Sequence, residues 1–355
     1  MHVAFVPIWP NNPYHLELAT ALRALGVRVA YPESLKSLYA DWRAGLALDV
    51  VHLHALPRFE WTPGPSARCA LFYHRLTQLQ RAGVRVIWTV HDLQNHEARQ
   101  RGIEDFLART FSHRVNALIV HGASAGTILR ATWGEDIADR LHVIPHGNYI
   151  HSYPNQISRT EARASFGFAP ANLVFSFLGL IRPYKGVVPM VEAFRSCNDP
   201  DIRLLIAGKP LDNVIEKEIR LAIQEDSRIQ FRPGYVAPED IQVYLNASDV
   251  FVLPYQRILT SGAAVLGMSF GKACIAPRAG CVTDMLTEGA GALFFDPAVR
   301  DDLKRVIHQA VACRERLSEM GLYNLRCARD WDWDRIARAT ASVYTSITPL
   351  RYDHC

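Results

Sequence analysis

The segment Leu173–Phe194 reads L-V-F-S-F-L-G-L-I-R-P-Y-K-G-V-V-P-M-V-E-A-F. An apolar run typical of a buried strand ends at Gly179, and a helical pattern begins after Gly186. The loop between them carries Arg182 and Lys185. A loop that leads into a helix has unpaired backbone N–H groups at the positive end of the helix dipole. Two cations there predict a diphosphate site, with a surface Arg and Lys beside an ordinary turn as the simpler alternative.

Short apolar runs alternate with longer helical segments along the whole chain. In the first half these runs are residues 2–8, 27–30, 50–53, 84–90, 117–120 and 141–144. In the second half they are residues 173–178, 203–207, 229–231, 250–253, 273–276 and 292–295. Strands that alternate with helices form βαβ units, so the sequence predicts an α/β protein with two doubly wound parallel sheets.

The chain has 355 residues, more than a single core usually serves. The polar segment 146–160 shows neither the helix nor the strand period and marks a boundary. We therefore expect a first domain at 1–147, a linker at 148–160 and a second domain at 161–330. The amphipathic C-terminal segment 331–355 is expected to cap the second domain or to cross back to the first.

Charge and cysteine content restrict the class of protein. The net charge of +4 fits anionic substrates or an anionic membrane surface and falls short of a nucleic-acid-binding signature. The seven cysteines form no C-x-x-C pair, so neither a disulfide framework nor a zinc site is indicated. No apolar run approaches the roughly 18 residues of a membrane span, and no leader pattern opens the chain. We expect a cytoplasmic protein, soluble or peripheral at the inner face of the membrane.

Two common nucleotide motifs are absent from the sequence. The first apolar run is followed by W-P-N-N-P-Y instead of G-x-G-x-x-G, which argues against a nicotinamide or flavin cofactor bound in the usual way. No G-x-x-x-x-G-K-[ST] occurs either, which argues against a P-loop ATPase.

The loop T-V-H-D-L-Q-N-H-E, residues 89–97, is crowded with groups able to act as acid or base. His91, Asp92, His96 and Glu97 all follow one buried strand. In the simpler alternative, Asp92 caps the next helix, Glu97 occupies its first turn and one histidine is structural. The spacing H-x-x-x-x-H in a loop without a third ligand is not a metal signature, so we predict no structural zinc.

Polar side chains also follow other strands of the first half. His52 and His54 occur in V-H-L-H, and His121 occurs in I-V-H-G. Because parallel strands end at one edge of the sheet, these histidines predict a polar floor there. Asn12 and Tyr14 are weaker candidates, since a turn and a helix start explain them equally well.

A second anion-binding element is predicted in the second half. Thr260, Ser261 and Gly262 precede an apolar helix, where they either cap its N–H groups or leave them available to a phosphate. Together with Arg182 and Lys185 they favour a diphosphate ligand. The other donor-side candidates in strand-end loops of this half are Gly208, Lys209 and Tyr235.

These elements, in this order, resemble the GT-B glycosyltransferases over nearly the whole chain. The nucleotide-sugar half is similar in F-L-G-L-I-R-P-Y-K-G, L-L-I-A-G-K-P and D-V-F-V-L-P-Y-Q-R-I-L-T-S-G. The acceptor half and linker are similar in V-H-L-H, W-T-V-H-D-L-Q-N-H-E and I-P-H-G-N-Y. Among relatives of glycosyltransferase family 4, the chain resembles the β-mannosyltransferases of xanthan-like polysaccharide assembly.

The resemblance implies two Rossmann-like domains facing across a cleft, the first for the acceptor and the second for the nucleotide sugar. It implies transfer of a hexose from a nucleoside diphosphate sugar, GDP-mannose foremost, to a hydroxyl of a glycan or lipid-linked glycan. No metal or other cofactor is expected, because Arg182, Lys185 and the helix start at Thr260–Gly262 take the place of Mg²⁺. The expected bases are Glu97, then His91, then Asp92. The expected acceptor contacts are Asn12, Tyr14, His54, His96 and His121.

One departure from family 4 bears on the stereochemistry. Its retaining enzymes usually carry E-x(7)-E, and the matching positions here are Ile258 and Leu266. Leu180 stands where that family usually has an Arg, which is displaced here to Arg182. The loss of both carboxylates favours inversion. The alternatives are a retaining transferase with another donor such as UDP-glucose, a sugar-nucleotide epimerase or phosphorylase of the same fold, and a non-catalytic sugar-nucleotide-binding subunit.

Overall fold

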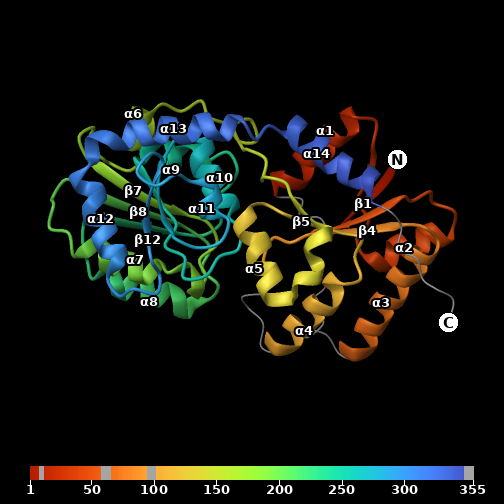
Figure 1. The fold of residues 1–355 in the computed structure, drawn as a ribbon. Helices are drawn as coiled ribbons and strands as arrows, with labels where there is room; N and C mark the ends of the chain where they lie inside the picture. The colour runs from red at the N-terminus through yellow and green to blue at the C-terminus, as the bar shows by residue number, and fades with distance from the viewer. Residues whose placement is uncertain (8–11, 57–64, 94–100, 348–355) are drawn as a thin grey trace. The chain divides into compact units, whose positions relative to one another are not determined.

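The protein folds into two units. The structure is a computed structural model, and it describes residues 1–7, 12–56, 65–93 and 101–347. The first unit combines Met1–Gly147 with Asp332–Cys355, and the second is Asn148–Trp331 (Figure 1). The candidates His96 and Glu97 lie outside the described residues.

The first unit is a parallel α/β sheet with helices on both faces. Its elements are β1 (His2–Val6), α1 (Pro13–Ala24), β2 (Arg28–Ala30), α2 (Leu35–Arg43), β3 (Val50–Leu53), α3 (Pro65–Arg81), β4 (Arg85–Thr89), α4 (Arg101–Ser112), β5 (Ala117–Val120), α5 (Ala123–Trp133), β6 (Leu141–Val143) and α14 (Trp333–Ser346). The strand order is β2-β1-β3-β4-β5-β6, and every described pair is parallel.

Neighbouring residues of β4 show how both faces of this sheet are buried. Ile87 belongs to the apolar core formed with α1 and α14. Trp88 points to the other face, where its ring centroid lies 5.5 Å from that of Phe111 in α4 and 5.2 Å from that of Trp133 in α5. Because successive residues of a strand face opposite sides, a sheet covered on both faces needs nearly continuous apolar strands. This explains the unbroken apolar runs in the sequence.

The C-terminal helix α14 is part of the first unit. It packs against α1, as Figure 1 also shows. The carbonyl oxygen of Tyr344 accepts a hydrogen bond from Arg85 at 2.6 Å, and its hydroxyl lies 2.6 Å from Nδ1 of the buried His52. These contacts join α14 to β3 and β4.

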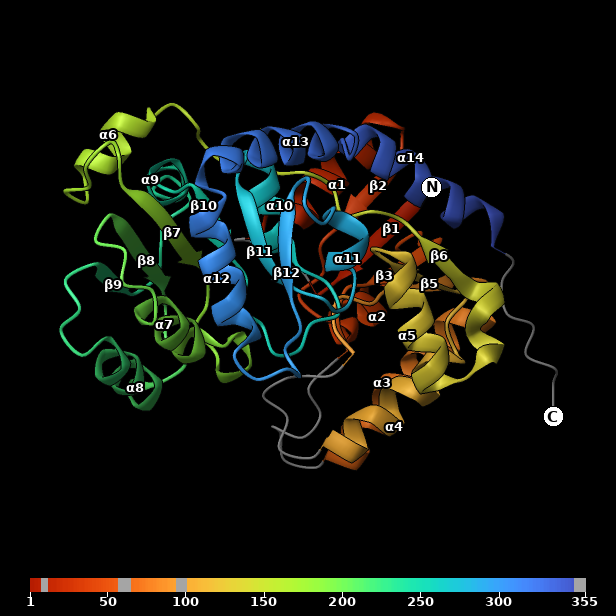
Figure 2. The same cartoon turned by 60° about the vertical axis from the view of Figure 1, so that its left-hand side comes forward.

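The second unit has the same architecture. Its elements are α6 (Arg159–Ala164), β7 (Leu173–Leu178), α7 (Val187–Arg195), β8 (Ile202–Gly208), α8 (Asn213–Ile223), β9 (Ile229–Pro233), α9 (Ile241–Ala247), β10 (Val250–Val252), α10 (Gly262–Ser269), β11 (Ala273–Pro277), α11 (Val282–Met285), β12 (Ala292–Phe295), α12 (Asp302–Ala312) and α13 (Leu317–Arg329). Helices α7, α8 and α12 cover one face of the sheet, and α9, α10 and α13 cover the other (Figures 1 and 2). Short 3-10 turns lie at Glu135–Arg140 in the first unit and at Pro183–Lys185 and Arg314–Arg316 in the second.

The strand order of this unit places two distant loops side by side. The order is β12-β11-β10-β7-β8-β9, so the chain runs outward from β7 to β9 and then returns to β10 on the other side of β7. Ligands of open α/β sheets bind at such a reversal, at the carboxyl ends of the two central strands. The loops after β7 and β10 are the ones that carry Lys185 and Ser261.

The segment expected as a linker, residues 148–160, is bonded to the second unit. The N–H of Tyr149 donates to Oγ of Ser269 at 2.9 Å. Further along, the N–H of Ile157 donates to Oε1 of Gln242 at 3.1 Å. The change from one unit to the other therefore falls at Gly147 and Asn148.

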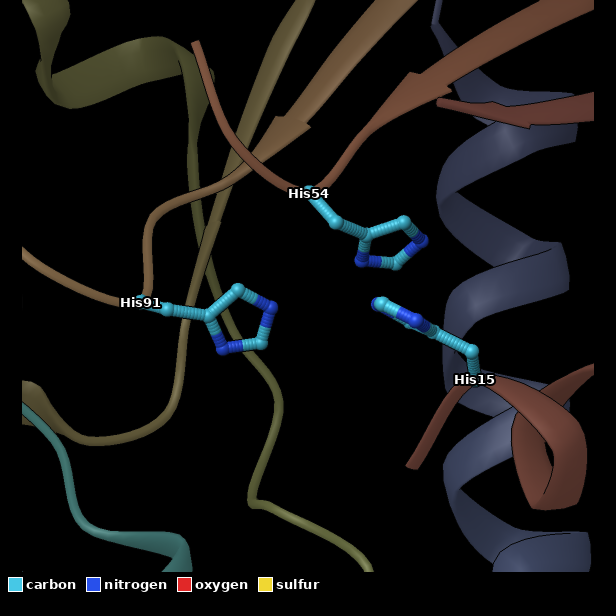
Figure 3. Close-up of side chains that lie close together, drawn as sticks. All are labelled: His15, His54 and His91. Atoms are coloured by element: carbon cyan, nitrogen blue, oxygen red, sulfur yellow. The ribbon is translucent and has the colours of Figure 1, made fainter. Parts of the chain in front are cut away.

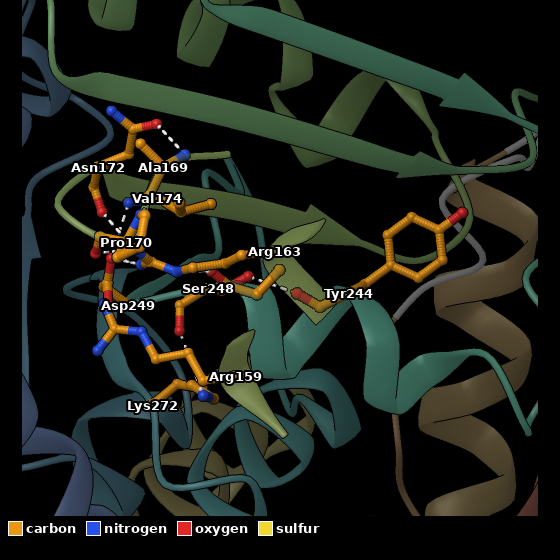
Figure 4. Close-up of polar contacts among 11 residues, drawn as sticks. Arg159, Arg163, Ala169, Pro170, Asn172, Val174, Tyr244, Ser248, Asp249 and Lys272 are labelled. Carbon is orange, nitrogen blue, oxygen red and sulfur yellow. Dashed lines mark hydrogen bonds and ion pairs between the residues drawn. The ribbon is translucent and has the colours of Figure 1, made fainter. Parts of the chain in front are cut away.

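A buried arginine holds the amino-terminal edge of the second sheet together (Figure 4). Arg163 is only 2% exposed, and its guanidinium forms an ion pair of 2.6 Å with Asp249. Asp249 also accepts from the N–H of Val174 at 2.8 Å and from Arg159 at 2.6 Å. The remaining guanidinium N–H groups donate to the carbonyl oxygens of Ala169, Pro170, Asn172 and Ala247. This network ties α6 to the starts of β7 and β10, opposite the edge where their loops carry the candidate residues.

Asp249→Ala is expected to lower the free energy of unfolding of the second unit by about 3–5 kcal/mol, because it leaves the charge of Arg163 buried without its partner. The matched control is Glu216→Ala, which removes an exposed pair with Arg220 and should cost about 0.5 kcal/mol or less. Scanning calorimetry measures both variants, and equally small effects would contradict this account of the network.

Candidate functional site

Six buried or partly buried histidines gather at the carboxyl-terminal edge of the first sheet. They come from α1, from β3 and its end, and from the segments after β4, β5 and β6: His15, His52, His54, His91, His121 and His146. The ring of Tyr14 lies among them, with its centroid 5.1 Å from that of His91 and 5.5 Å from that of His121. The predicted polar floor therefore exists within this unit, and it is larger than the sequence indicated.

Burial keeps these imidazoles neutral. Desolvation is the main cause that lowers the pKa of each ring from 6.5, to about 4 for His15 and His121 and to about 3 for His52 and His146. The pKa values of His54 and His91 are held well below 6.5 by burial first and then by the neighbouring histidines. At neutral pH each of these rings has one N–H group and one lone pair.

Hydrogen bonds fix which nitrogen of His91 carries the proton. Nδ1 of His121 lies 3.0 Å from the carbonyl oxygen of Ile144, so it must be the donor, and its neutral ring then has a lone pair on Nε2. That Nε2 lies 3.3 Å from Nδ1 of His91, which must therefore donate. The lone pair of His91 is left on Nε2, a buried atom with no hydrogen-bond partner in the part of the chain that the structure describes.

His54 lies close to His91. Both of its ring nitrogens are buried, and neither has a hydrogen-bond partner among residues 1–7, 12–56, 65–93 and 101–347. The rings of His54, His91 and His15 are turned toward one another, as Figure 3 shows. His15 was not predicted as a site residue, because a histidine in the first turn of an amphipathic helix gives no signal of its own.

The remaining candidates of the first unit are placed differently. Asn12 is the N-cap of α1, and its Oδ1 accepts the N–H of Tyr14 at 3.1 Å, as the helix-start explanation expects. Tyr14 is buried and its hydroxyl bonds to Thr89. Asp92 is exposed beside His91. His146 belongs to the motif I-P-H-G-N-Y but was not predicted as a site residue, and it lies at the start of the polar segment expected to mark the domain boundary.

In the second unit, the loops after β7 and β10 are joined directly. The carbonyl oxygen of Tyr184 accepts the N–H of Gln256 at 2.8 Å. Nζ of Lys185 lies 5.2 Å from the centroid of the Tyr255 ring, within the range of a cation–π contact. The ammonium group is thereby held at the strand reversal.

Two glycines allow neighbouring backbone segments to approach each other closely at these strand ends. Gly186 has φ +64°, and a Cβ atom there would lie 2.1 Å from the carbonyl oxygen of Pro254. Gly208, with φ +148°, would place a Cβ atom 1.7 Å from the carbonyl oxygen of Gly179. No other residue fits either position without moving the backbone. The contact between the loops after β7 and β10 therefore depends on Gly186, and the contact between the ends of β7 and β8 depends on Gly208.

The start of α10 offers one side chain that caps and one that does not. Oγ of Ser261 accepts the N–H of Ala264 at 3.0 Å, which is the capping role. Oγ1 of Thr260 is buried and has no hydrogen-bond partner in the described parts of the chain. A buried hydroxyl of this kind is a donor that a bound anion can use.

The other donor-side candidates are near the same loops or exposed. The carbonyl oxygen of Lys209 accepts the N–H of Ile181 at 2.9 Å, which pairs the segments after β7 and β8. Arg182 is half-buried and donates to the neighbouring carbonyl oxygen of Ile181. Tyr235, after β9, is 62% exposed. The sequence did not single out Tyr184, because it contributes through its backbone.

Comparison with known proteins relates the chain to glycosyltransferases. Residues 158–325, within the second unit, match the family described as glycosyl transferases group 1. GDP-mannose:glycolipid 4-beta-D-mannosyltransferase of Xanthomonas campestris is 28% identical over 279 residues, which are 75% of this chain and 70% of that protein. D-inositol 3-phosphate glycosyltransferase of Nocardia farcinica is 27% identical over 240 residues, 64% of this chain and 52% of that protein.

Solved structures match the fold over almost the full chain. Sucrose-phosphate synthase from Thermosynechococcus elongatus has a TM-score of 0.79 at 17% identity and covers 97% of this chain and 98% of its own. Anabaena HepE in complex with UDP has a TM-score of 0.76 at 17% identity, with coverage of 98% and 100%. The chain is a glycosyltransferase with the GT-B fold, which confirms the family resemblance. No helix within the described ranges is long and apolar enough to cross a membrane.

Proposed function

We propose that this glycosyltransferase moves a hexose from a nucleoside diphosphate sugar, with GDP-mannose as the first choice, to a hydroxyl of a glycan or lipid-linked glycan. The observation that carries the donor class is the junction at Gly186, where the loops after β7 and β10 meet and Lys185 is held. The choice of mannose is supported by the Xanthomonas relative, whose name states GDP-mannose as donor and a glycolipid as acceptor.

The second unit stabilises the leaving diphosphate in this proposal. Lys185 and Arg182 supply positive charge, and Thr260 and the first N–H groups of α10 supply hydrogen bonds to the phosphate oxygens. Negative charge grows on the diphosphate as the bond to the sugar breaks, so groups already in place there lower the barrier. These charges take the role that Mg²⁺ has in other transferases, and the proposed reaction is metal-independent.

The first unit supplies the acceptor site and the base. Glu97 is ranked first, His91 second and Asp92 third. The base removes the proton of the acceptor hydroxyl, which then attacks the anomeric carbon directly. The residues proposed to contact the acceptor are Asn12, Tyr14, His54, His96 and His121.

We propose inversion because the two positions that carry Glu in retaining relatives have no carboxylate here. Ile258 is half-buried and Leu266 is buried in α10, so neither position offers an acid to the donor. A retaining enzyme that uses UDP-glucose would give the opposite anomer from an inverting one, and NMR of the product distinguishes the two. An epimerase would turn over the sugar nucleotide without an acceptor, and a non-catalytic subunit would bind it without turnover.

GDP is expected to bind in EDTA, and Lys185→Ala and Arg182→Ala should each weaken that binding by about 1.5–3 kcal/mol, as charge-assisted contacts do. Arg326→Ala, an exposed cation on α13, is the matched control and should bind GDP as the wild type does. Calorimetry measures all four proteins. Unchanged affinity in both loop variants would remove the diphosphate assignment, and binding that requires Mg²⁺ or Mn²⁺ would remove the metal-independent one.

Glu97→Gln is expected to reduce turnover by about 10²-fold or more while GDP binding stays near wild type, because the amide cannot accept the acceptor proton. His91→Ala and Asp92→Asn are measured beside it. If Glu97→Gln keeps most of its turnover while another variant loses it, the ranking is wrong. If all three variants remain active, the base lies outside this loop.

A lipid-linked acceptor would bring the protein to the inner face of the membrane as a peripheral protein. The net charge of +4 favours an anionic surface. Flotation with anionic liposomes at low salt is expected to recover the protein, and salt should release it. Absence from the liposome fraction together with full activity on a short soluble oligosaccharide would contradict a membrane-bound acceptor.

A further inference from the structure

We propose that His15, His54 and His91 bind one divalent transition metal ion of the zinc class. Each residue offers one ring nitrogen, and the three atoms lie within 4.8 Å of one another. They come from α1, from the end of β3 and from the end of β4, so no sequence spacing reveals them. This site goes beyond the proposed transfer reaction and lies wholly within the first unit.

His91 is oriented as a metal ligand. His121 donates through Nδ1 to the carbonyl oxygen of Ile144, and His91 donates through Nδ1 to Nε2 of His121. The lone pair of His91 therefore lies on Nε2. Metal-binding histidines usually donate their other N–H to a fixed acceptor in this way, which sets the tautomer and the direction of the ring. Here the fixed acceptor is another histidine, which is itself anchored to a backbone carbonyl.

His54 gives the second reason. A buried donor or acceptor without a partner costs about 1–3 kcal/mol, so such groups usually have an ion or water beside them. Both ring nitrogens of His54 and Nε2 of His91 are buried and have no hydrogen-bond partner among the described residues. An ion between them satisfies one nitrogen on each ring at once.

The ligand set selects the kind of metal. Neutral imidazoles suit Zn²⁺, Co²⁺, Ni²⁺ and Cu²⁺, whereas Mg²⁺ and Mn²⁺ prefer oxygen ligands. Nitrogens bonded to one tetrahedral Zn²⁺ at about 2.0–2.1 Å lie about 3.4 Å apart, so binding draws the three rings together by small rotations. Three protein ligands leave the fourth position open, and the partly exposed His91 provides a route for entry.

Metal binding here has a consequence for the transfer reaction. The lone pair of His91 Nε2 would be held by the ion, and Nδ1 already donates to His121. His91 would then have no site for the acceptor proton, and the role of base would be left to Glu97 or Asp92.

Co²⁺ added to the metal-stripped protein is expected to give visible d–d absorption bands of a tetrahedral site, with one ion bound per chain and displacement by Zn²⁺. His54→Ala and His91→Ala should abolish the bands, while His74→Ala, an exposed histidine on α3, should keep them. His121→Phe keeps His91 but removes its acceptor, and it should weaken Co²⁺ binding by about 10–100-fold. Bands that persist in both ligand variants, or no bands in the wild type, would overturn the proposal.

X-ray absorption at the zinc edge tests the wild type alone, so it does not depend on the folding of any variant. The spectrum should show nitrogen or oxygen neighbours at about 2.0–2.1 Å with the outer scattering of imidazole rings. A sulfur neighbour at about 2.3 Å would place the ion on cysteines and overturn the assignment. Neither measurement uses the transfer reaction, so a failed metal site and a failed donor or acceptor assignment are distinguishable.

Discussion

The close approach of two backbone loops in the second unit is the constraint on which the proposed donor site depends. Gly186 passes so near the carbonyl oxygen of Pro254 that no side chain fits between them. This contact holds the loop after β7 against the loop after β10, and it sets the position of Lys185 over Tyr255. The backbone thereby positions the positive charge that we propose for the diphosphate, and electrostatic stabilisation is most effective when the charge is in place before the ligand binds.

The strand ends of the two sheets differ in charge: those of the second unit carry cations, and those of the first carry neutral histidines. In the second unit, Lys185 lies at the junction of two loops, and the ion pair of Arg163 and Asp249 joins α6 to the opposite edge of the sheet. In the first unit, burial has removed the charge from a group of histidines, and their hydrogen bonds determine where protons and lone pairs lie. Neutral imidazoles can accept a proton or bind a metal ion, whereas protonated ones can do neither.

The sequence predicted the sheets because a strand that is buried on both faces is apolar throughout. The runs at 50–53, 117–120, 173–178 and 292–295 match β3, β5, β7 and β12 residue for residue. The site at the Lys185 loop could be predicted from the sequence, because strand, cation and glycine are neighbours in the chain. The grouping of His15 with His54 and His91 was missed, because it is made by three segments that only the fold brings together. The hydrogen bonds between residues 148–160 and the second unit could not be predicted from the sequence, because bonds from backbone N–H groups to distant side chains leave no periodic pattern.

A crystal structure of the protein with bound GDP tests the central claim most directly. The account predicts that the diphosphate lies at the reversal between β7 and β10, with its oxygens within hydrogen-bond distance of Lys185 Nζ and of the first N–H groups of α10. A diphosphate bound among the strand ends of the first unit, or away from both loops of the second, would contradict it.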